Sequence, residues 1–326
     1  MADPVLDVSD LSVRISSRDG EARAVNGISF SVNAGEAVAL LGESGSGKSM
    51  TALAVMGMLP ERARIVSGSI RLSGTELVGA TEKEYRQIRG RRIAIVFQDA
   101  LSALNPVVSV GRQVAEMFTV HEHLGHADAR AAAIDAMTRV RIPSAAQRYG
   151  DYPHQFSGGM RQRILIAMMI ALRPEVLIAD EPTTALDVTV EAAIMDLLTE
   201  LRAETGMGLV LITHDLGVAA SAADRVTVMY AGRAMEQGET AVVLSNTAHP
   251  YTQGLMRSVA PLDDGSGRLP AIPGLPPSLM KLPSGCLFRP RCALAIDLCA
   301  REPEWSLAAP DHWSRCWRAD EVMSHG

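Results

Sequence analysis

Residues 42–49 read Gly42-Glu43-Ser44-Gly45-Ser46-Gly47-Lys48-Ser49 and match the pattern G-x-x-x-x-G-K-[ST]. The apolar run Glu36–Leu41 directly before them predicts a buried strand, and Met50–Met58 behind them predicts a helix. In a strand–loop–helix of this kind, glycines let backbone N–H groups surround phosphate oxygens, and the helix N-terminus adds a positive dipole. The pattern places Lys48 at the β- and γ-phosphates and Ser49 on Mg²⁺. We therefore predict a nucleotide-binding loop rather than a flexible Gly/Ser loop.

A second strand, Val176–Ala179, ends in two carboxylates, Asp180 and Glu181. Buried carboxylates are costly unless they meet a cation, so Asp180 suits Mg²⁺, directly or through water. Glu181 is then placed to accept a proton from an attacking water. A strand end capped by solvated charges is the alternative, which the phosphate-binding loop elsewhere in the chain disfavours.

A third motif, Phe156–Gln162, has the composition of a helix start. Ser157 is a natural N-cap, and the first N–H groups of the helix that runs on to Leu172 form an anion site. Taken alone, this motif is also that of an ordinary helix start.

Apolar runs and helical patterns alternate along the first 245 residues, which is typical of an α/β domain. Leu209–Ile212 predicts a further buried strand. Helical stripes over Val110–Val120 and Ala127–Val140 predict a helical subdomain inserted into the sheet domain.

The three motifs, in this order and spacing, resemble those of an ATP-binding cassette (ABC) ATPase over roughly residues 5–245. Gly42–Ser49 is similar to Walker A, Ser157–Gln162 to the signature, and Asp180-Glu181 to the end of Walker B. Three further elements are similar to family motifs: Gln98 in Val96–Asp99 to the Q-loop, Asp187 in Ala185–Asp187 to the D-loop, and His214 in Leu211–Asp215 to the switch histidine.

The resemblance implies a P-loop NTPase of the ABC type, with a RecA-like core, an antiparallel β subdomain and a helical subdomain at about 100–170. Two cassettes of the family dimerise head to tail, with ATP between Walker A of one and the signature of the other. The implied catalytic residues are Glu181, His214, Gln98 and Lys48. The implied Mg²⁺ ligands are Ser49, Gln98 and Asp180. The implied ATP-binding residues are Gly42, Glu43, Ser44, Gly45, Ser46, Gly47, Lys48, Ser49, Met50, Ser157, Gly158, Gly159 and Asp187.

Longer stretches resemble a narrower group, the ATPases of dipeptide and oligopeptide importers. These stretches are Phe97–Pro106, Tyr152–Arg163, His249–Leu255 and Ile272–Gly274. Met160, where many cassettes have Gln, resembles the first of the two ATPase subunits that such importers use. The implied partners are a non-identical second ATPase, two transmembrane permease subunits and, indirectly, an extracytoplasmic peptide-binding protein.

Composition sets limits on partners and location. The net charge of −6 disfavours a broad electrostatic contact with nucleic acid. The N-terminus carries acidic residues where a secretory signal has positive charge, and the longest strongly apolar stretch, Ile164–Leu172, is too short to cross a bilayer. We expect a peripheral protein on the cytoplasmic face of the cell membrane.

Residues 246–326 form a different compositional region, which we predict to be a loop-rich C-terminal extension. Nine of the 17 prolines lie between Pro261 and Pro310, and all four cysteines lie in the last 41 residues, at Cys286, Cys292, Cys299 and Cys316. Cytosolic cysteines at this density indicate metal or cluster ligands rather than disulfides. The spacing lacks the C-x₂₋₄-C pairs typical of zinc, so we favour a [4Fe–4S] cluster, with zinc and free thiols as alternatives.

Two other functions fit parts of the sequence. A soluble ABC ATPase of DNA repair or translation is disfavoured, because such proteins carry a long coiled-coil insertion or two cassettes in one chain. An importer ATPase that serves nickel, glutathione or a short glycan remains an alternative, because the cassette does not touch the cargo. An exporter is disfavoured because no membrane span is fused to the cassette.

Overall fold

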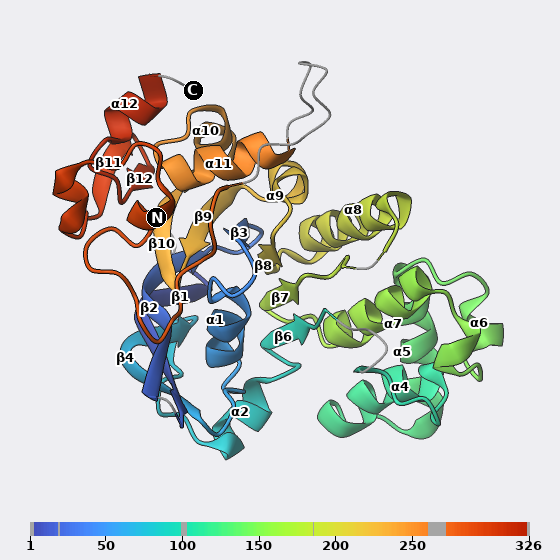
Figure 1. The fold of residues 1–326 in the computed structure, drawn as a ribbon. Helices are drawn as coiled ribbons and strands as arrows, with labels where there is room; N and C mark the ends of the chain where they lie inside the picture. Colours follow the sequence, from blue (N-terminus) through green and yellow to red (C-terminus); the bar gives the residue numbers. More distant parts are fainter. Residues whose placement is uncertain (1–2, 19, 99–102, 185, 260–271, 325–326) are drawn as a thin grey trace. The chain divides into compact units, whose positions relative to one another are not determined.

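The computed structural model describes residues 3–18, 20–98, 103–184, 186–259 and 272–324. The chain divides into two compact units (Figure 1). The first comprises residues 1–32, 37–79 and 211–326, and the second comprises residues 33–36 and 80–210. Among the described helices, none has the length and apolar character that a membrane crossing requires.

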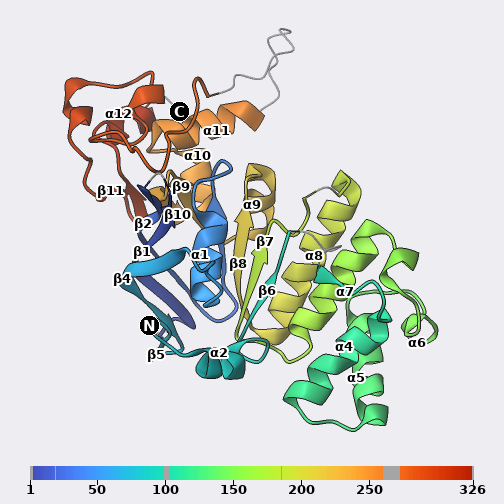
Figure 2. The same ribbon diagram turned by 60° about the horizontal axis from the view of Figure 1, so that its bottom comes forward.

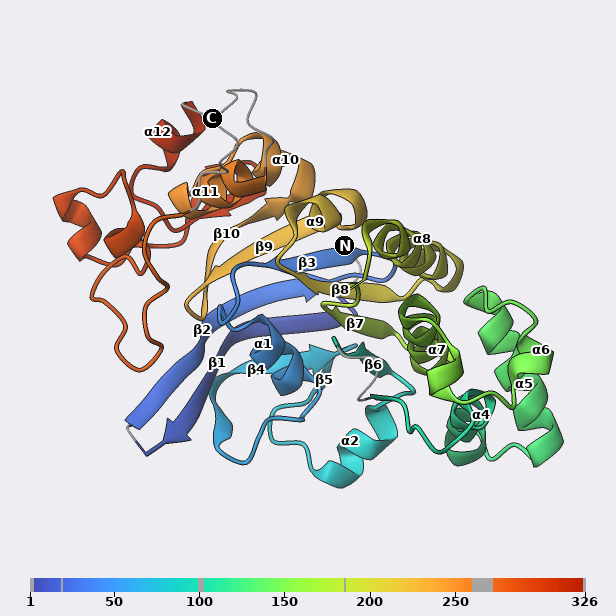
Figure 3. The same ribbon diagram turned by 45° about the vertical axis from the view of Figure 1, so that its right-hand side comes forward.

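An antiparallel sheet lies in the first unit, as the resemblance implied (Figure 3). Its strand order is β2-β1-β4-β5. The strands are β1 (Leu6–Ser17), β2 (Gly20–Val32), β4 (Ala63–Leu72) and β5 (Thr75–Glu76). Buried and more exposed residues largely alternate along β1, the pattern of a sheet that packs one face on a core.

The first unit also contains the strand that precedes the phosphate-binding motif. All five residues of β3 (Ala37–Leu41) are buried, and β3 pairs in parallel with β9 (Arg225–Tyr230). Burial of every residue is typical of a parallel strand covered on both faces. Helix α1 (Lys48–Val55) begins inside the motif and ends before the predicted Met58, because Gly57 takes a left-handed φ of 61°.

The second unit contains the predicted helical subdomain, in which α4, α5 and α7 pack together (Figure 2). The described helices of the second unit are α2 (Glu82–Ile88), α4 (Val110–His121), α5 (His126–Arg139), α6 (Ala145–Arg148), η1 (Pro153–Gln155), α7 (Gly158–Ile170) and α8 (Val188–Thr205). Strands β6 (Ile93–Val96) and β7 (Val176–Asp180) pair in parallel. The residues of β8 (Gly208–Thr213) are divided between the two units.

The described part of the C-terminal region is poor in long elements, as its prolines predict. It follows α9 (Leu216–Ala222), β10 (Arg233–Glu239) and α10 (Thr240–Ser245). Its own described elements are α11 (Pro250–Val259), η2 (Arg289–Arg291), η3 (Asp297–Ala300), β11 (Ser306–Ala309), β12 (His312–Ser314) and α12 (Ala319–Ser324). Strand β12 pairs with both β11 and β10, so the region adds a hairpin to the sheet that contains β10.

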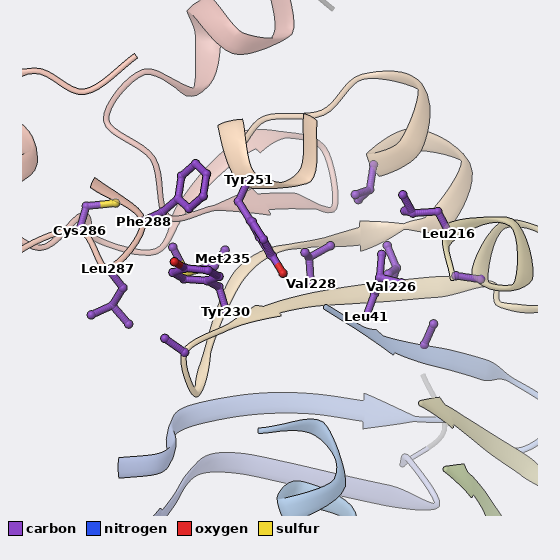
Figure 4. Close-up of a cluster of buried hydrophobic side chains, with 14 of the residues drawn as sticks. Leu41, Leu216, Val226, Val228, Tyr230, Met235, Tyr251, Cys286, Leu287 and Phe288 are labelled. Atoms are coloured by element: carbon purple, nitrogen blue, oxygen red, sulfur yellow. The ribbon is translucent and has the colours of Figure 1, made fainter. Parts of the chain in front are cut away.

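The extension shares its apolar core with the cassette. Tyr230 of β9, Tyr251 of α11 and Phe288 form a three-ring cluster with centroid separations of 4.7–5.4 Å (Figure 4). Cys286 and Leu287 are buried beside them. The sequence predicted a loop-rich extension, and in the structure the part of it around Phe288 packs on β9 and α11. The proposed boundary between residues 245 and 246 stays a prediction.

Candidate nucleotide site

The phosphate-binding motif connects β3 to α1 through a loop that only glycine fits at two positions. Gly47 is the N-cap of α1 with a φ of 105°, and a Cβ there would lie 2.4 Å from the carbonyl oxygen of Ala24. A Cβ on Gly42 would lie 2.2 Å from the carbonyl oxygen of Met229. The loop therefore lies directly against backbone on both sides, and side chains at these positions would displace it.

The ammonium group of Lys48 lies inside this loop. Its Nζ donates to the carbonyl oxygens of Gly42, at 2.7 Å, and Glu43, at 3.0 Å, and the residue is 4% exposed. A buried cation next to the N-terminus of α1 gives the loop the charge that a phosphate group requires. Ser49 and Met50 follow in the first turn of α1, which begins two residues before the predicted helix start at Met50.

Glu43 brings the C-terminal extension into contact with the loop. Its backbone N–H donates to Tyr251 Oη at 2.9 Å. Its carboxylate accepts two hydrogen bonds from Arg291, at 2.6 and 3.0 Å. Burial raises the pKa of Tyr251, and the hydrogen bond to Glu43 raises that of Arg291. Sequence reasoning assigned no role to Tyr251 or Arg291, because nothing in their local sequence points to a loop more than 200 residues away.

In the second unit the two carboxylates lie at the end of β7, with Asp180 as its last residue and Glu181 directly after it. Asp180 is buried at 8% exposure, and Glu181 takes a left-handed φ of 47°. Glu181 Oε2 accepts hydrogen bonds from Gln98 Nε2 at 3.0 Å and from Thr184 Oγ1 at 2.9 Å. The left-handed backbone orients the side chain of Glu181, and the two hydrogen bonds hold its carboxylate in one position. Sequence reasoning missed Thr184, although a hydroxyl three residues after the carboxylate is a signal that could have found it.

The predicted signature begins α7 as expected. Ser157 Oγ accepts from the N–H of Met160 at 3.4 Å, which makes it the N-cap. A Cβ on Gly159 would lie 2.4 Å from Cγ1 of Val190 in α8. Asp187 caps α8 by accepting from the N–H of Val190 at 3.0 Å. The signature and the predicted D-loop are therefore neighbours in this unit.

The remaining predicted residues fall in separate places. His214 is exposed immediately after β8, and Asp215 behind it caps α9. His214 and the phosphate-binding loop belong to the first unit, whereas Gln98, Asp180 and Glu181 belong to the second, together with Ser157–Gly159 and Asp187. The Q-loop residues 99–102 and the D-loop residue Ala185 lie outside the described residues.

The four cysteines gather in the extension without forming a disulfide. The N–H of Cys286 donates to the carbonyl oxygen of Cys299 at 3.0 Å. Burial raises the pKa of Cys316 to about 12, and the other three cysteines act in the same direction. Within the described ranges, no three His, Cys, Asp or Glu side chains are grouped to hold a metal ion. The structure thus gives the predicted cluster and its zinc alternative no support from ligand geometry.

Comparisons with known proteins agree with the motifs. The ABC transporter family matches residues 25–184, and the oligopeptide/dipeptide transporter C-terminal region matches residues 235–299. The chain is 44% identical over 322 residues to the oligopeptide transport ATP-binding protein OppD of Salmonella typhimurium, covering 99% of this chain and 96% of that protein. It is 45% identical to the protein of the same name from Escherichia coli, covering 99% and 95%.

A solved structure shows the same fold. The dimeric structure of MJ0796, a bacterial ABC transporter cassette, aligns with a TM-score of 0.65 and 24% identity. The alignment covers 72% of this chain and 98% of that one. These matches confirm the family resemblance and the fold class predicted from the motifs. The chain belongs to the ABC transporter ATPases, in the group that carries the oligopeptide/dipeptide transporter C-terminal region.

Proposed function

We propose that the chain is the ATP-hydrolysing subunit of an importer that takes up dipeptides and oligopeptides. One observation carries the proposal: the similarity to proteins named oligopeptide transport ATP-binding protein runs through nearly the whole chain, extension included. A soluble ABC ATPase of DNA repair or translation is not favoured by these relatives. Nickel, glutathione or a short glycan is the alternative cargo, and the uptake test below distinguishes these from peptides.

The phosphate chain of ATP binds at the loop 42–49 in this proposal. The backbone N–H groups of the loop and Lys48 neutralise the phosphate oxygens, and His214, after β8, approaches the γ-phosphate. Ser49, Gln98 and Asp180 offer the oxygen donors that Mg²⁺ prefers, and one of these donors, Asp180, is a buried carboxylate. The ion, when bound, neutralises charge that develops on the transferring phosphate.

Glu181 is the proposed general base. Its carboxylate is fixed by Gln98 and Thr184, so that it accepts a proton from water without first having to reorient. Phosphoryl transfer depends mainly on positioning and charge neutralisation, and the two hydrogen bonds supply the positioning.

A second cassette completes the site. We propose that Ser157, Gly158 and Gly159 at the start of α7, with Asp187 nearby, face the ATP bound by a partner ATPase, which is a non-identical subunit. Two transmembrane permease subunits hold the pair at the cytoplasmic face of the membrane, and an extracytoplasmic peptide-binding protein delivers the cargo. No nucleic acid takes part.

We also propose that Cys286, Cys292, Cys299 and Cys316 hold a [4Fe–4S] cluster. Cys316 interacts electrostatically with the other three thiols, and a cluster would bind all four as thiolates, although burial raises the pKa values of Cys286, Cys292 and Cys316. Protein that is purified anaerobically should contain iron and acid-labile sulfide. A colourless, zinc-loaded sample, or one free of both metals, would contradict the cluster.

Uptake by cells tests the transport function. A strain without the gene should lose uptake of a radiolabelled tripeptide, and the intact gene should restore it. The Glu181→Gln variant, which keeps the site but lacks the base, should fail to restore it. Undiminished peptide uptake in the deletion strain, together with lost uptake of nickel, glutathione or a glycan, would refute the peptide assignment.

A further inference from the structure

All three polar groups of Glu43 are engaged, each by a different residue. Its N–H donates to Tyr251 Oη, and its carbonyl oxygen accepts from Lys48 Nζ at 3.0 Å. Its carboxylate accepts both Nη atoms of Arg291. Glu43 therefore connects the phosphate-binding lysine directly to the C-terminal extension.

The side chain of Arg291 is fixed and buried, with 4% of it exposed. Its Nε donates to the carbonyl oxygen of Pro273 at 2.9 Å, and Nη2 donates to that of Ile272 at 3.3 Å. The guanidinium carbon lies 5.7 and 5.9 Å from the ring centroids of Tyr230 and Phe288, which meet edge to face (Figure 4). Because so many contacts hold Arg291, the ion pair with Glu43 is not a mobile surface pair.

The position of Arg291 also depends on the cysteine segment. Arg291 ends η2, which lies between Cys286 and Cys292. The N–H of Arg289 donates to the carbonyl oxygen of Cys286 at 3.1 Å, and the N–H of Cys292 donates to that of Arg289 at 3.2 Å. The fold of this segment therefore determines where the guanidinium lies.

The charge of Glu43 requires compensation if the loop is to bind a triphosphate. An uncompensated carboxylate within the loop would repel the phosphate groups and draw Lys48 toward itself. We propose that Arg291 is a positioning residue for ATP: it neutralises Glu43 and holds the loop in the conformation that accepts phosphate. The extension thereby sets the affinity of the ATP site. The inference rests on the ATP-binding part of the proposed function and not on the identity of the cargo.

Calorimetric titration of the full chain with MgATPγS tests this role. Arg291→Met removes the charge and keeps the length of the side chain, and should weaken binding on the order of tenfold, the effect of one uncompensated charge near the phosphates. In the assembled transporter, Arg291→Met should raise KM for ATP more than it lowers kcat. Arg289→Met is the matched control, because Arg289 belongs to the same short helix and is exposed. It should bind as the unmodified chain does.

The double variant Glu43→Gln/Arg291→Met separates this role from a structural one. It removes both charges, so its affinity should return to within about threefold of the unmodified chain, because an uncharged pair leaves no buried ion without a partner. An unchanged dissociation constant in Arg291→Met overturns the inference, as does a double variant that binds no better than Arg291→Met.

If the Arg291→Met variant does not fold, the role of Arg291 can still be tested in the Glu43→Gln background. Adding Arg291→Met to Glu43→Gln removes a buried charge that has already lost its partner, so it should cost no affinity if Arg291 acts through Glu43. A further tenfold loss in the double variant would overturn the inference. ATP binding without peptide uptake by the unmodified chain would refute only the proposed cargo.

Discussion

Gln98 and Glu181 are separated by 83 positions in the sequence, yet Nε2 of Gln98 lies 3.0 Å from Oε2 of Glu181. The amide donates to one carboxylate oxygen, and the hydroxyl of Thr184 donates to the same atom. Hydrogen bonds that fix a general base in place reduce the reorganisation that proton transfer requires. The two donors therefore hold the carboxylate of Glu181, the proposed base, in one position.

Replacing Glu181 with Gln tests that assignment. The variant keeps a side chain of the same size and can retain the contact with Thr184, but it cannot accept the proton from water. We expect kcat of the assembled transporter to fall by about 10²–10⁴, the usual contribution of a general base, while MgATP binds normally. Phosphate release and nucleotide titration measure the two quantities separately. Glu200→Gln, on the exposed face of α8, is the control; hydrolysis by Glu181→Gln at the unmodified rate would show that another group is the base.

Thr184 gives a second prediction about the same carboxylate. Thr184→Val removes the hydroxyl and preserves the shape of the side chain, so Glu181 loses one of two positioning donors. We expect kcat to fall about tenfold, the cost of one hydrogen bond to a charged group, with little change in KM. Thr184→Ser keeps the hydroxyl and should recover most of the rate. Equal rates for the Val and Ser variants would mean that the hydroxyl does not position the base.

Gly159 tests the close contact between the signature helix and α8. Gly159→Ala places a Cβ 2.4 Å from Cγ1 of Val190, so the Val190 side chain or one of the two helices has to shift. Overpacking of this kind costs about 1–3 kcal/mol, so thermal unfolding should occur at a lower temperature. Gly158→Ala is the matched control, since a Cβ there meets only Leu186 Cδ2, at 3.4 Å. Adding Val190→Ala to Gly159→Ala should restore the melting temperature; no recovery would place the strain elsewhere.

Much of this site could be predicted from the sequence, because local motifs carry their own geometry. Gly42–Ser49 needs only its strand and helix, and Ser157 caps a helix that starts at the next residue. The contacts of Glu43 could not be predicted in this way. Arg291 and Tyr251 reach it from 248 and 208 positions away, and their placement depends on aromatic packing that no short sequence pattern encodes.

The hairpin β11–β12 was missed for a related reason. Its strands have four and three residues, too few for a recognisable alternation, and they form because β10 offers an edge on which β12 can pair. Pairing with a neighbouring strand can form a short strand even where the local sequence has a weak preference for β structure. The surrounding prolines correctly indicated loops but concealed the strands between them.

Buried His249 makes stability depend on pH. Burial lowers its pKa from 6.5 to about 3, and its Nδ1 accepts from the N–H of Tyr251 at 3.0 Å. In the unfolded chain the imidazole takes up a proton below about pH 6.5, whereas the folded chain keeps it neutral down to about pH 3. The unfolded state therefore binds more protons in this window. His249 alone should lower the free energy of unfolding by up to about 1.4 kcal/mol per pH unit as the pH falls.

Urea unfolding of two variants between pH 7 and pH 4 isolates this contribution. His249→Asn retains an acceptor where Nδ1 lies and does not titrate, so its free energy of unfolding should fall less steeply with decreasing pH. The variant loses ring packing against Phe288 and should be less stable at pH 7. His126→Asn replaces an exposed histidine and should keep the slope of the unmodified chain. An equal slope in His249→Asn would show that other groups cause the loss of stability in acid. A flatter slope would assign that loss to His249, whose Nδ1 accepts from the N–H of Tyr251.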